Sequence, residues 1–252
     1  MNFKYYNLVR ALTVSDFKLR YHGSFLGLFW AFLKPLFLFG VLYTVFSIFV
    51  HFPIPHYGLY LLLGIIIWNF FAEATTLSLK NLLQKAPLIR KIYFPPSILI
   101  FSSLSIAFLN LGANLFIFAV IALWVGIPIS FSILLVFVWI GVLYLFVLGF
   151  SFGLSAFNVK LKDVEHLWDI FLPLGLWITP IAYSVDMVSA KYHWVFNLNP
   201  MAVIVQNIRT AVLGGPPPSL GSDLSLGIMV TIVCILGYTL FQSQALSFAE
   251  EL

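Results

Sequence analysis

Long runs of apolar residues, separated by short polar segments, dominate the pattern of this sequence. A helix needs about 20 apolar residues to cross the hydrocarbon core of a bilayer. Because a helix satisfies its own backbone hydrogen bonds, lipid favours it for such runs. The pattern therefore predicts an all-α polytopic membrane protein that forms a single transmembrane domain, residues 1–252. Six transmembrane helices are predicted, at residues 25–50, 57–79, 97–125, 130–157, 170–183 and 224–244.

The last third of the sequence departs from this pattern. Residues 170–183 are apolar but contain two prolines, and residues 195–212 form a shorter apolar run with polar side chains inside it. These polar residues are Asn197, Asn199, Gln206, Asn207 and Arg209. Such segments persist at membrane depth only where protein or a watery cavity covers them. We therefore expect the fifth span to be followed by a re-entrant or interfacial hairpin near the outer surface.

Residues 3–20 show the apolar spacing of an amphipathic helix. Asp16 falls on the apolar side and weakens the pattern. The arrangement predicts a helix that lies in the membrane interface, and an ordinary basic tail is the alternative. The other residues on the apolar side are Tyr5, Leu8, Val9, Leu12 and Leu19.

Composition and charge place the chain in a membrane and orient it. Of the 252 residues, 62% are hydrophobic and 9% are charged, which leaves too little polar surface for a water-soluble fold. The net charge of +4 is no sign of nucleic-acid binding, because the basic residues stand at the ends of apolar runs. With both termini in the cytoplasm, eleven of the 13 Lys and Arg residues are cytoplasmic, and only Lys191 and Arg209 are outside. This bias predicts a multi-pass protein with both termini cytoplasmic.

A basic segment, residues 80–96, separates the second and third apolar runs. It carries Lys80, Lys85, Arg90 and Lys91. Short loops rich in Lys and Arg stay on the cytoplasmic side of a membrane. We therefore expect a cytoplasmic loop whose mixture of basic and apolar side chains suits docking against a soluble partner.

Polar and small residues inside the predicted spans are candidates for function or for helix packing. Glu73 is ionisable and hence a functional candidate, although contact with headgroup water or pairing with a lysine of the basic segment is the simpler explanation. Asn110 and Asn114 lie four residues apart on one face, which favours hydrogen bonding between helices over ligand binding. Gly149 and Gly153 have the same spacing and predict close helix contact.

The sequence offers little support for catalysis or metal binding. It contains no G-x-x-x-x-G-K-[ST] loop for nucleotide phosphates, and no H-E-x-x-H or C-x-x-C motif. The five histidines fall on both sides of the predicted membrane, so no metal site is expected and no catalytic residue is assigned. We expect a protein of this kind to take its energy from a partner.

Several segments resemble landmarks of the type-2 ABC exporter permeases, and within them the permeases that export O-antigen and related lipid-linked polysaccharides. Residues 18–35 (KLRYHGSFLGLFWAFLKP) are similar to the segment that leads into the family's first span, and residues 88–96 (LIRKIYFPP) to its cytoplasmic coupling segment. Residues 154–164 (LSAFNVKLKDV), 179–183 (TPIAY) and 198–200 (LNP) resemble later landmarks. Together these segments extend the resemblance over nearly the whole chain.

The resemblance implies a transport subunit rather than an enzyme. Two copies of the chain would form the pore as a homodimer in the bacterial inner membrane. Two separate ATP-binding subunits, which use ATP and Mg, would bind the coupling helix at residues 80–96, and this chain would hold no cofactor itself. Residues 180–212 would contain the outer gate helices. The residues implied in ATPase coupling are Lys85, Leu88, Arg90, Lys91 and Tyr93.

The same resemblance implies a lipid-linked O-antigen-type polysaccharide as the substrate. Export of a teichoic acid, a drug or a small lipid is the alternative within the family. Sugar faces pack well on aromatic rings, so aromatic residues in the spans are candidates for the substrate path, and a lipid-facing aromatic belt is the alternative. These candidates are Tyr60, Trp68, Phe71, Tyr144, Phe150 and Trp177.

Two charged residues, Lys34 and Glu73, complete the candidate path. Lys34, together with Lys85 and Arg90, could receive the pyrophosphate of a lipid carrier through charge-assisted hydrogen bonds, and anchoring to lipid headgroups is the alternative. A proton-coupled carrier is the alternative from a different class of protein. It predicts that Glu73→Gln abolishes transport.

Overall fold

The structure is a computed structural model that describes residues 3–23, 27–91, 94–128, 130–161, 163–215 and 219–244. The described residues form helices and their connections, with no β-strand among them, so the all-α class is confirmed. The α-helices are α1 (Phe3–Tyr21), α2 (Trp30–Tyr43), α3 (Tyr57–Gln84), α4 (Ala86–Lys91), α5 (Ser97–Val125), α6 (Leu134–Lys160), α7 (Val164–Ile178), α8 (His193–Asn197), α9 (Pro200–Leu213) and α10 (Leu220–Gln244). The shorter elements are η1 (Gly27–Phe29), the π-helix η2 (Thr44–Phe49), η3 (Phe131–Ile133), η4 (Val185–Met187) and η5 (Ala190–Tyr192).

Within the described ranges, five helical segments are long and apolar enough to cross a membrane. They are α2 continued by η2, α3, α5, η3 continued by α6, and α10. Helix α7 corresponds to the predicted fifth span, but it begins earlier, at Val164, and ends at Ile178, before Pro180. Its 15 residues span about 22 Å, which is shorter than a hydrocarbon core of about 30 Å. The count of six crossings therefore stays a prediction.

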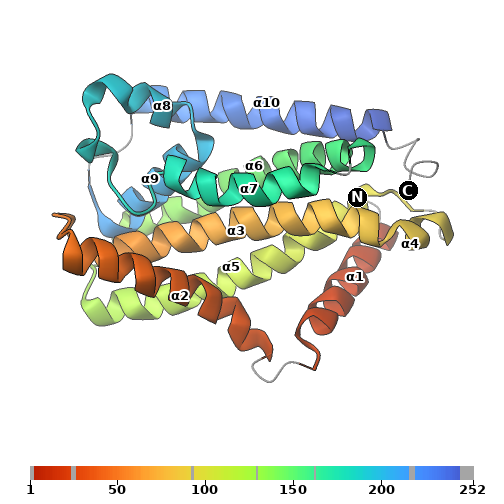
Figure 1. Ribbon diagram of the computed structural model, residues 1–252, viewed down its shortest axis with the longest axis horizontal. Helices are drawn as coiled ribbons and strands as arrows, with labels where there is room; N and C mark the ends of the chain where they lie inside the picture. Colours follow the sequence, from red (N-terminus) through yellow and green to blue (C-terminus); the bar gives the residue numbers. More distant parts are fainter. Residues whose placement is uncertain are drawn as a thin grey trace.

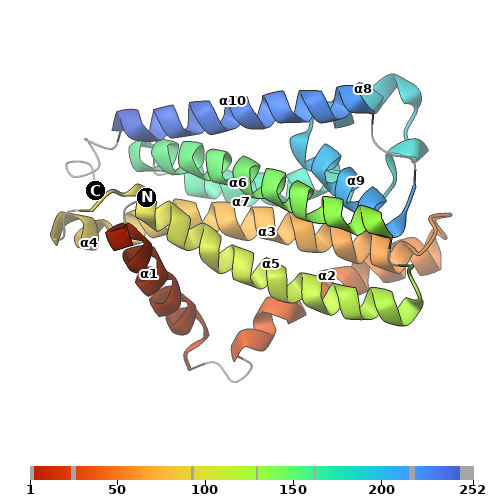
Figure 2. The ribbon, with the colours of Figure 1, turned by 180° about the vertical axis from the view of Figure 1, so that it is seen from behind.

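Helix α3 lies at the centre of the bundle (Figures 1 and 2). Helices α2, α5, α6, α7 and α9 all contact it. In its most apolar window 72% of the residues are buried, against 33% or fewer in the other four candidate spans. Residues 59–68 are all buried. A helix that is apolar on every side suits this central position.

The region between α7 and α10 closes one end of the bundle, at the left in Figure 1. Helix α9 begins where the Asn199 side chain accepts hydrogen bonds from the backbone amides of Met201 and Ala202, with Pro200 as its first residue. Nine of its 14 residues are buried. Along α9, protein therefore covers most of the polar side chains of the apolar run at residues 195–212, as the sequence analysis expected for polar residues at membrane depth.

Helices α6 and α10 pack backbone against backbone. A Cβ atom added at Gly237 would lie 2.0 Å from the carbonyl oxygen of Gly149, and one added at Gly149 would lie 2.7 Å from the Cα atom of Cys234. One added at Gly153 would lie 3.7 Å from the Cα atom of Gly237. The close helix contact predicted from Gly149 and Gly153 is confirmed, and Gly237 is its partner on α10.

Helix α1 lies across the other end of the bundle, where α4 is found and α10 ends (Figures 1 and 2). Val9 and Thr13 are buried, and Tyr5, Leu8 and Leu12 are partly buried against the core. Much of the predicted apolar side therefore contacts protein. Leu19 was expected on that side but is 72% exposed, because the last turns of α1 diverge from α5.

Candidate functional site

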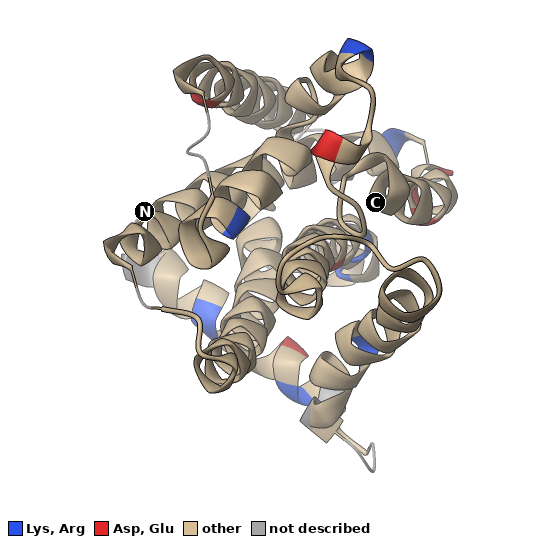
Figure 3. Ribbon diagram, turned by 90° about the vertical axis from the view of Figure 1, so that its left-hand side faces the viewer, with Lys and Arg blue, Asp and Glu red and all other residues tan. Residues whose placement is uncertain are grey.

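Charged residues are sparse along the ribbons when the bundle is viewed end-on (Figure 3). Among the described residues, three ion pairs join α3 or the residue that ends it to another helix. Arg20 and Asp16 of α1 pair with Glu73 and Lys85, and Glu165 of α7 pairs with Lys80 at 3.1 Å. Because charges interact more strongly in weakly polar surroundings than in water, these pairs hold α1 and α7 against the central helix.

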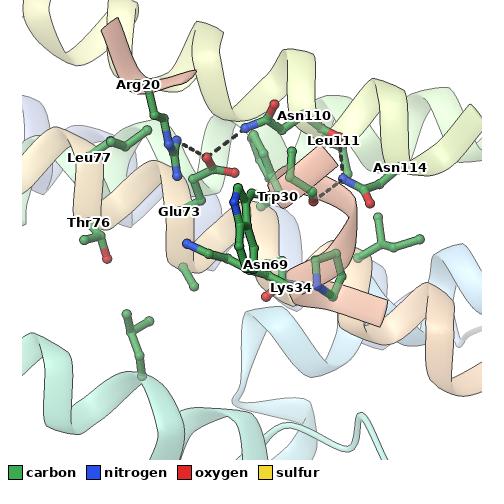
Figure 4. A pocket seen from close by; sticks show the side chains of 16 residues that line it. Arg20, Trp30, Lys34, Asn69, Glu73, Thr76, Leu77, Asn110, Leu111 and Asn114 are labelled. Carbon is green, nitrogen blue, oxygen red and sulfur yellow. Dashed lines mark hydrogen bonds and ion pairs between the residues drawn. The ribbon is translucent and has the colours of Figure 1, made fainter. Parts of the chain in front are cut away.

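A cavity of about 670 Å³, here called the polar cavity, lies between α1, α2, α3 and α5 (Figure 4). Leu172 of α7 also lines it, and Trp30, Pro35 and Phe70 add apolar surface. Cavities of several hundred Å³ in which a few polar groups converge on an apolar wall are typical of binding sites. The polar cavity is therefore the candidate functional site. Its polar residues are Arg20, Lys34, Asn69, Glu73, Thr76, Asn110 and Asn114.

The Glu73 carboxylate is the centre of hydrogen bonding in the polar cavity. Its Oε1 atom accepts a hydrogen bond from the Arg20 guanidinium and another, 2.8 Å long, from the side-chain amide of Asn110 (Figure 4). Three helices, α1, α3 and α5, thus meet at one carboxylate. The partner is Arg20 rather than the expected lysine, because the Arg20 side chain reaches Glu73 from the last turn of α1, whereas Lys80 pairs with Glu165 and Lys85 with Asp16.

Asn114 joins α5 to the first turn of α2. Its side-chain amide donates to the carbonyl oxygen of Asn110 at 2.8 Å and to that of Ala31 at 3.4 Å (Figure 4). With the Asn110–Glu73 bond, this confirms the prediction that the two asparagines bond between helices. Both also line the polar cavity, so they hold its walls in place.

The structure brings two of the eight predicted substrate-path residues into the polar cavity. They are Lys34 and Glu73, from α2 and α3. The Lys34 side chain is exposed, and within the described part of the chain no carboxylate lies within ion-pair distance of it. The site therefore contains a cation whose charge is not matched by a neighbouring carboxylate.

The aromatic candidates lie elsewhere and do not form one surface. Phe71 packs against Trp68, Phe150 and Trp168, with ring centroids 5.3, 5.6 and 5.8 Å apart. Trp68 and Phe71 are each only 4% exposed, so in this conformation they contribute to the core between α3, α6 and α7. Tyr144 lines a separate groove between α1, α5 and α6, and Trp177 is half exposed near the end of α7. A glycan path along these rings stays a prediction.

The basic segment forms the short helix α4 after α3 ends at Lys85. Lys85 pairs with Asp16, and Leu88 is partly buried against the core. The side chains of Arg90 and Lys91, and the whole of Tyr93, lie outside the described residues. The pair explains why Asp16 breaks the apolar pattern of α1, since its carboxylate faces the end of α3 rather than lipid.

Reversing one charge of the Lys85–Asp16 pair is expected to destabilise the protein. Their side chains are 19% and 17% exposed, so Lys85→Glu would place two carboxylates together in a partly buried site, at a cost of about 1–3 kcal/mol. Adding Asp16→Lys should restore most of that loss. Thermal unfolding of the detergent-purified chain measures both effects, with Lys18→Glu on the exposed side of α1 as the control. A double variant less stable than Lys85→Glu would contradict the pairing.

Arg209 of α9 is a buried residue that the sequence analysis did not select as a site. Its side chain is 2% exposed and donates three hydrogen bonds to backbone carbonyl oxygens. Nε donates to Tyr60 at 3.1 Å, Nη1 to Pro180 at 2.6 Å and Nη2 to Ile181 at 2.7 Å. The guanidinium carbon lies 3.5 Å from the centroid of the Tyr60 ring, close enough for a cation–π interaction. A lone arginine in an apolar run was the available signal, because such a charge needs partners inside the protein.

Two tyrosines of α3 hold the same segment that Arg209 binds. The hydroxyl of Tyr57 donates to the carbonyl oxygen of Ala182 at 2.8 Å, and that of Tyr60 to the carbonyl oxygen of Tyr183 at 3.1 Å. Carbonyls of the irregular segment after α7 are thus satisfied by side chains from α3 and α9. Tyr60, predicted to line a substrate path, here anchors this segment.

Residues 149–153 match the G-x-S-x-G sequence of a nucleophile elbow. That motif acts at a sharp turn between a strand and a helix. Here Ser151 is buried in the middle of α6, and the flanking glycines serve the contact with α10. The match therefore reflects helix packing rather than catalysis.

Long apolar helices around a central helix, with a polar cavity beside it, define a multi-pass membrane protein of the α-helical class. In the described part of the chain no three His, Cys, Asp or Glu side chains gather as a metal site would require. Residues 7–213 match the sequence model of the ABC-2 type transporter family, and the chain belongs to that family. It is a component of membrane transport rather than an enzyme.

Full-length relatives point in the same direction. A protein of Klebsiella pneumoniae described as O-antigen export system permease protein RfbA is 28% identical, and the match covers 98% of this chain and 95% of the relative. A protein of Myxococcus xanthus with the same description is 23% identical, and the match covers 99% of this chain and 97% of the relative. The chain is therefore similar to O-antigen export permeases over its whole length.

Proposed function

We propose that this chain is the transmembrane subunit of an exporter that moves lipid-linked O-antigen-type polysaccharide across the bacterial inner membrane. The observation that carries the proposal is the end-to-end similarity to O-antigen export permeases within the ABC-2 family. The polar cavity supports it, because polar and ionisable side chains that face the interior of a membrane bundle typically mark the path of a polar substrate.

The energy source in this proposal is a separate ATP-binding subunit that uses ATP and Mg. The sequence has no phosphate-binding loop of its own. The helix α4 and the ion pair between Lys85 and Asp16 support contact with that subunit through residues 80–96, because Lys85 lies between α3 and α4 and its ion pair would pass a push on α4 to α1. With eleven basic residues assigned to this side, α4 and both ends of the chain face the cytoplasm.

The working unit we propose is a homodimer with two ATP-binding subunits. Helix α2 supports a second copy, since it packs on one side of the bundle and leaves large apolar side chains uncovered. Phe37 and Val41 are 65% and 63% exposed. In a dimer such surface faces either lipid or the partner copy.

Deleting the gene in its host tests the proposed function. We expect lipid-linked glycan to accumulate on the cytoplasmic side of the inner membrane and to disappear from the cell surface, and the wild-type gene to reverse both changes. Glycan on each side is measured by immunoblotting with and without permeabilisation. Unchanged surface glycan in the deletion strain would contradict the proposal and assign the transporter a smaller lipid, a drug or another polymer.

A further inference from the structure

The polar cavity has more positive than negative charge. Three of the side chains that line it are charged: Arg20, Lys34 and Glu73. Glu73 is bound by Arg20 and Asn110, whereas Lys34 has no carboxylate within ion-pair distance among the residues the structure describes. Cationic groups beside amide donors favour an anion, and phosphate oxygens are strong acceptors for both lysine and arginine.

The apolar part of the wall indicates what the anion is attached to. Trp30 and Pro35 of α2, Ile66 of α3 and Leu172 of α7 line the cavity beside the charged groups. Next to Lys34, Leu36 and Phe37 continue the apolar surface of α2 outward and are 39% and 65% exposed. In a membrane span such a surface lies against lipid tails, so an anion on an apolar chain can reach the cavity while its chain stays in lipid, whereas a free anion has no such chain to place there.

We propose that the polar cavity binds the phosphate or diphosphate head of the lipid-linked substrate through Lys34 and Arg20, and that Glu73 competes with this head for Arg20. The inference rests on the proposed function, which supplies a substrate with a lipid anchor. Asn69, Asn110 and Asn114 also line the cavity and add amide groups to its polar wall.

The competition at Arg20 links loading to the position of α1. In the present conformation the Arg20–Glu73 pair holds the last turn of α1 to α3, and its side chains are 34% and 20% exposed. The Arg20 side chain is therefore accessible enough to turn from the carboxylate to a phosphate. When Arg20 binds a phosphate, its ion pair with Glu73 is broken. The Lys85–Asp16 pair, one turn earlier in α1, stays in place.

Opposite effects of two neutral substitutions test the inference. The full chain is purified with its ATP-binding partner and titrated calorimetrically with farnesyl diphosphate, with inorganic pyrophosphate and farnesol as separate probes. Lys34→Gln should weaken farnesyl diphosphate binding at least about tenfold, because it removes a charged donor. Glu73→Gln should tighten it severalfold, because a neutral amide holds Arg20 less strongly. Lys18→Gln, an exposed residue of α1 outside the cavity wall, should leave binding unchanged.

The direction of the Glu73 effect separates competition from a structural role. If Glu73 only braces the helices, Glu73→Gln binds farnesyl diphosphate no better than the wild type, which overturns the competition. Wild-type affinity in Lys34→Gln overturns the site itself, independently of Glu73. Equal affinity for pyrophosphate and farnesyl diphosphate assigns the cavity to free phosphate and overturns the lipid-anchored ligand.

Surface glycan in cells separates this inference from the proposed function. If the deletion strain keeps its surface glycan while the binding pattern holds, the proposed polysaccharide is wrong and the cavity still binds a phosphorylated lipid. If the deletion strain loses its glycan but Lys34→Gln binds farnesyl diphosphate normally, the proposed function stands and the polar cavity is not the site that recognises the head.

Discussion

Replacing Arg209 with methionine is expected to produce the largest loss of stability of any single substitution considered in this protein. The change removes three donors to buried backbone carbonyls while filling most of the same space. Hydrogen bonds to charged groups contribute about 1.5–3 kcal/mol each, so the substitution is expected to lower the free energy of unfolding by several kcal/mol. That is a large part of the total stability of about 5–15 kcal/mol of a typical folded protein.

Arg209→Met should therefore reduce the yield of folded protein and lower its midpoint of thermal unfolding, and export should fall with it. Arg209→Lys should rescue only part of the loss, since an ammonium group cannot reproduce the planar fork that reaches three carbonyls. Lys191→Met, which removes an exposed charge in η5, is the matched control. An Arg209→Met protein that unfolds at the wild-type temperature would show that these hydrogen bonds are dispensable.

Gly237→Ala is expected to have the second largest effect. Its new Cβ would lie 2.0 Å from the carbonyl oxygen of Gly149, and a backbone atom cannot rotate away as a side chain can. Helix α10 would have to move off α6, and overpacking of this kind costs about 1–3 kcal/mol, occasionally more. We expect the value at the upper end, measured as a lower midpoint of thermal unfolding.

Gly227→Ala in the same helix is the control for Gly237. A Cβ at Gly227 would meet no atom within 4 Å, so the substitution adds only the helix preference of alanine. It should leave the unfolding midpoint unchanged or raise it slightly. Equal midpoints for the two alanine variants would mean that α6 and α10 can separate without cost, against the packing described for them.

The long helices were predictable because their signal is strong and local. An unbroken apolar run such as residues 97–125 has one stable form in lipid, and the structure gives a single helix there. The contact of Gly149 was predictable for the same reason, since small residues at this spacing mark a face that another backbone approaches. The sequence did not identify α10 as that backbone, because the partner lies about 85 residues further along the chain.

The polar cavity was predictable only in part. Lys34 and Glu73 stood out as charges inside apolar runs. The sequence did not indicate Arg20, because this residue lies in the last turn of a separate helix and comes close to Glu73 only in the folded bundle. Asp16 was interpreted as a flaw in an amphipathic face, whereas its partner Lys85 lies 69 residues away. Pairing of distant charges depends on how helices cross, and the periodicity of one helix carries no information about that crossing.

The glycine contact between α6 and α10 divides the bundle into a stiff part and a compliant part. At Gly149 and Gly237 backbone lies against backbone, so no side chain there can change rotamer and let one helix slide on the other, and Phe152 of α6 packs between Tyr238 and Phe241 of α10 beside this contact. Helix α2, by contrast, has only 11% of its apolar window buried and rests mainly on α3. A transport cycle that widens a path through this protein would therefore use α6 and α10 as a fixed wall and take up the displacement at α2, the side on which the polar cavity lies.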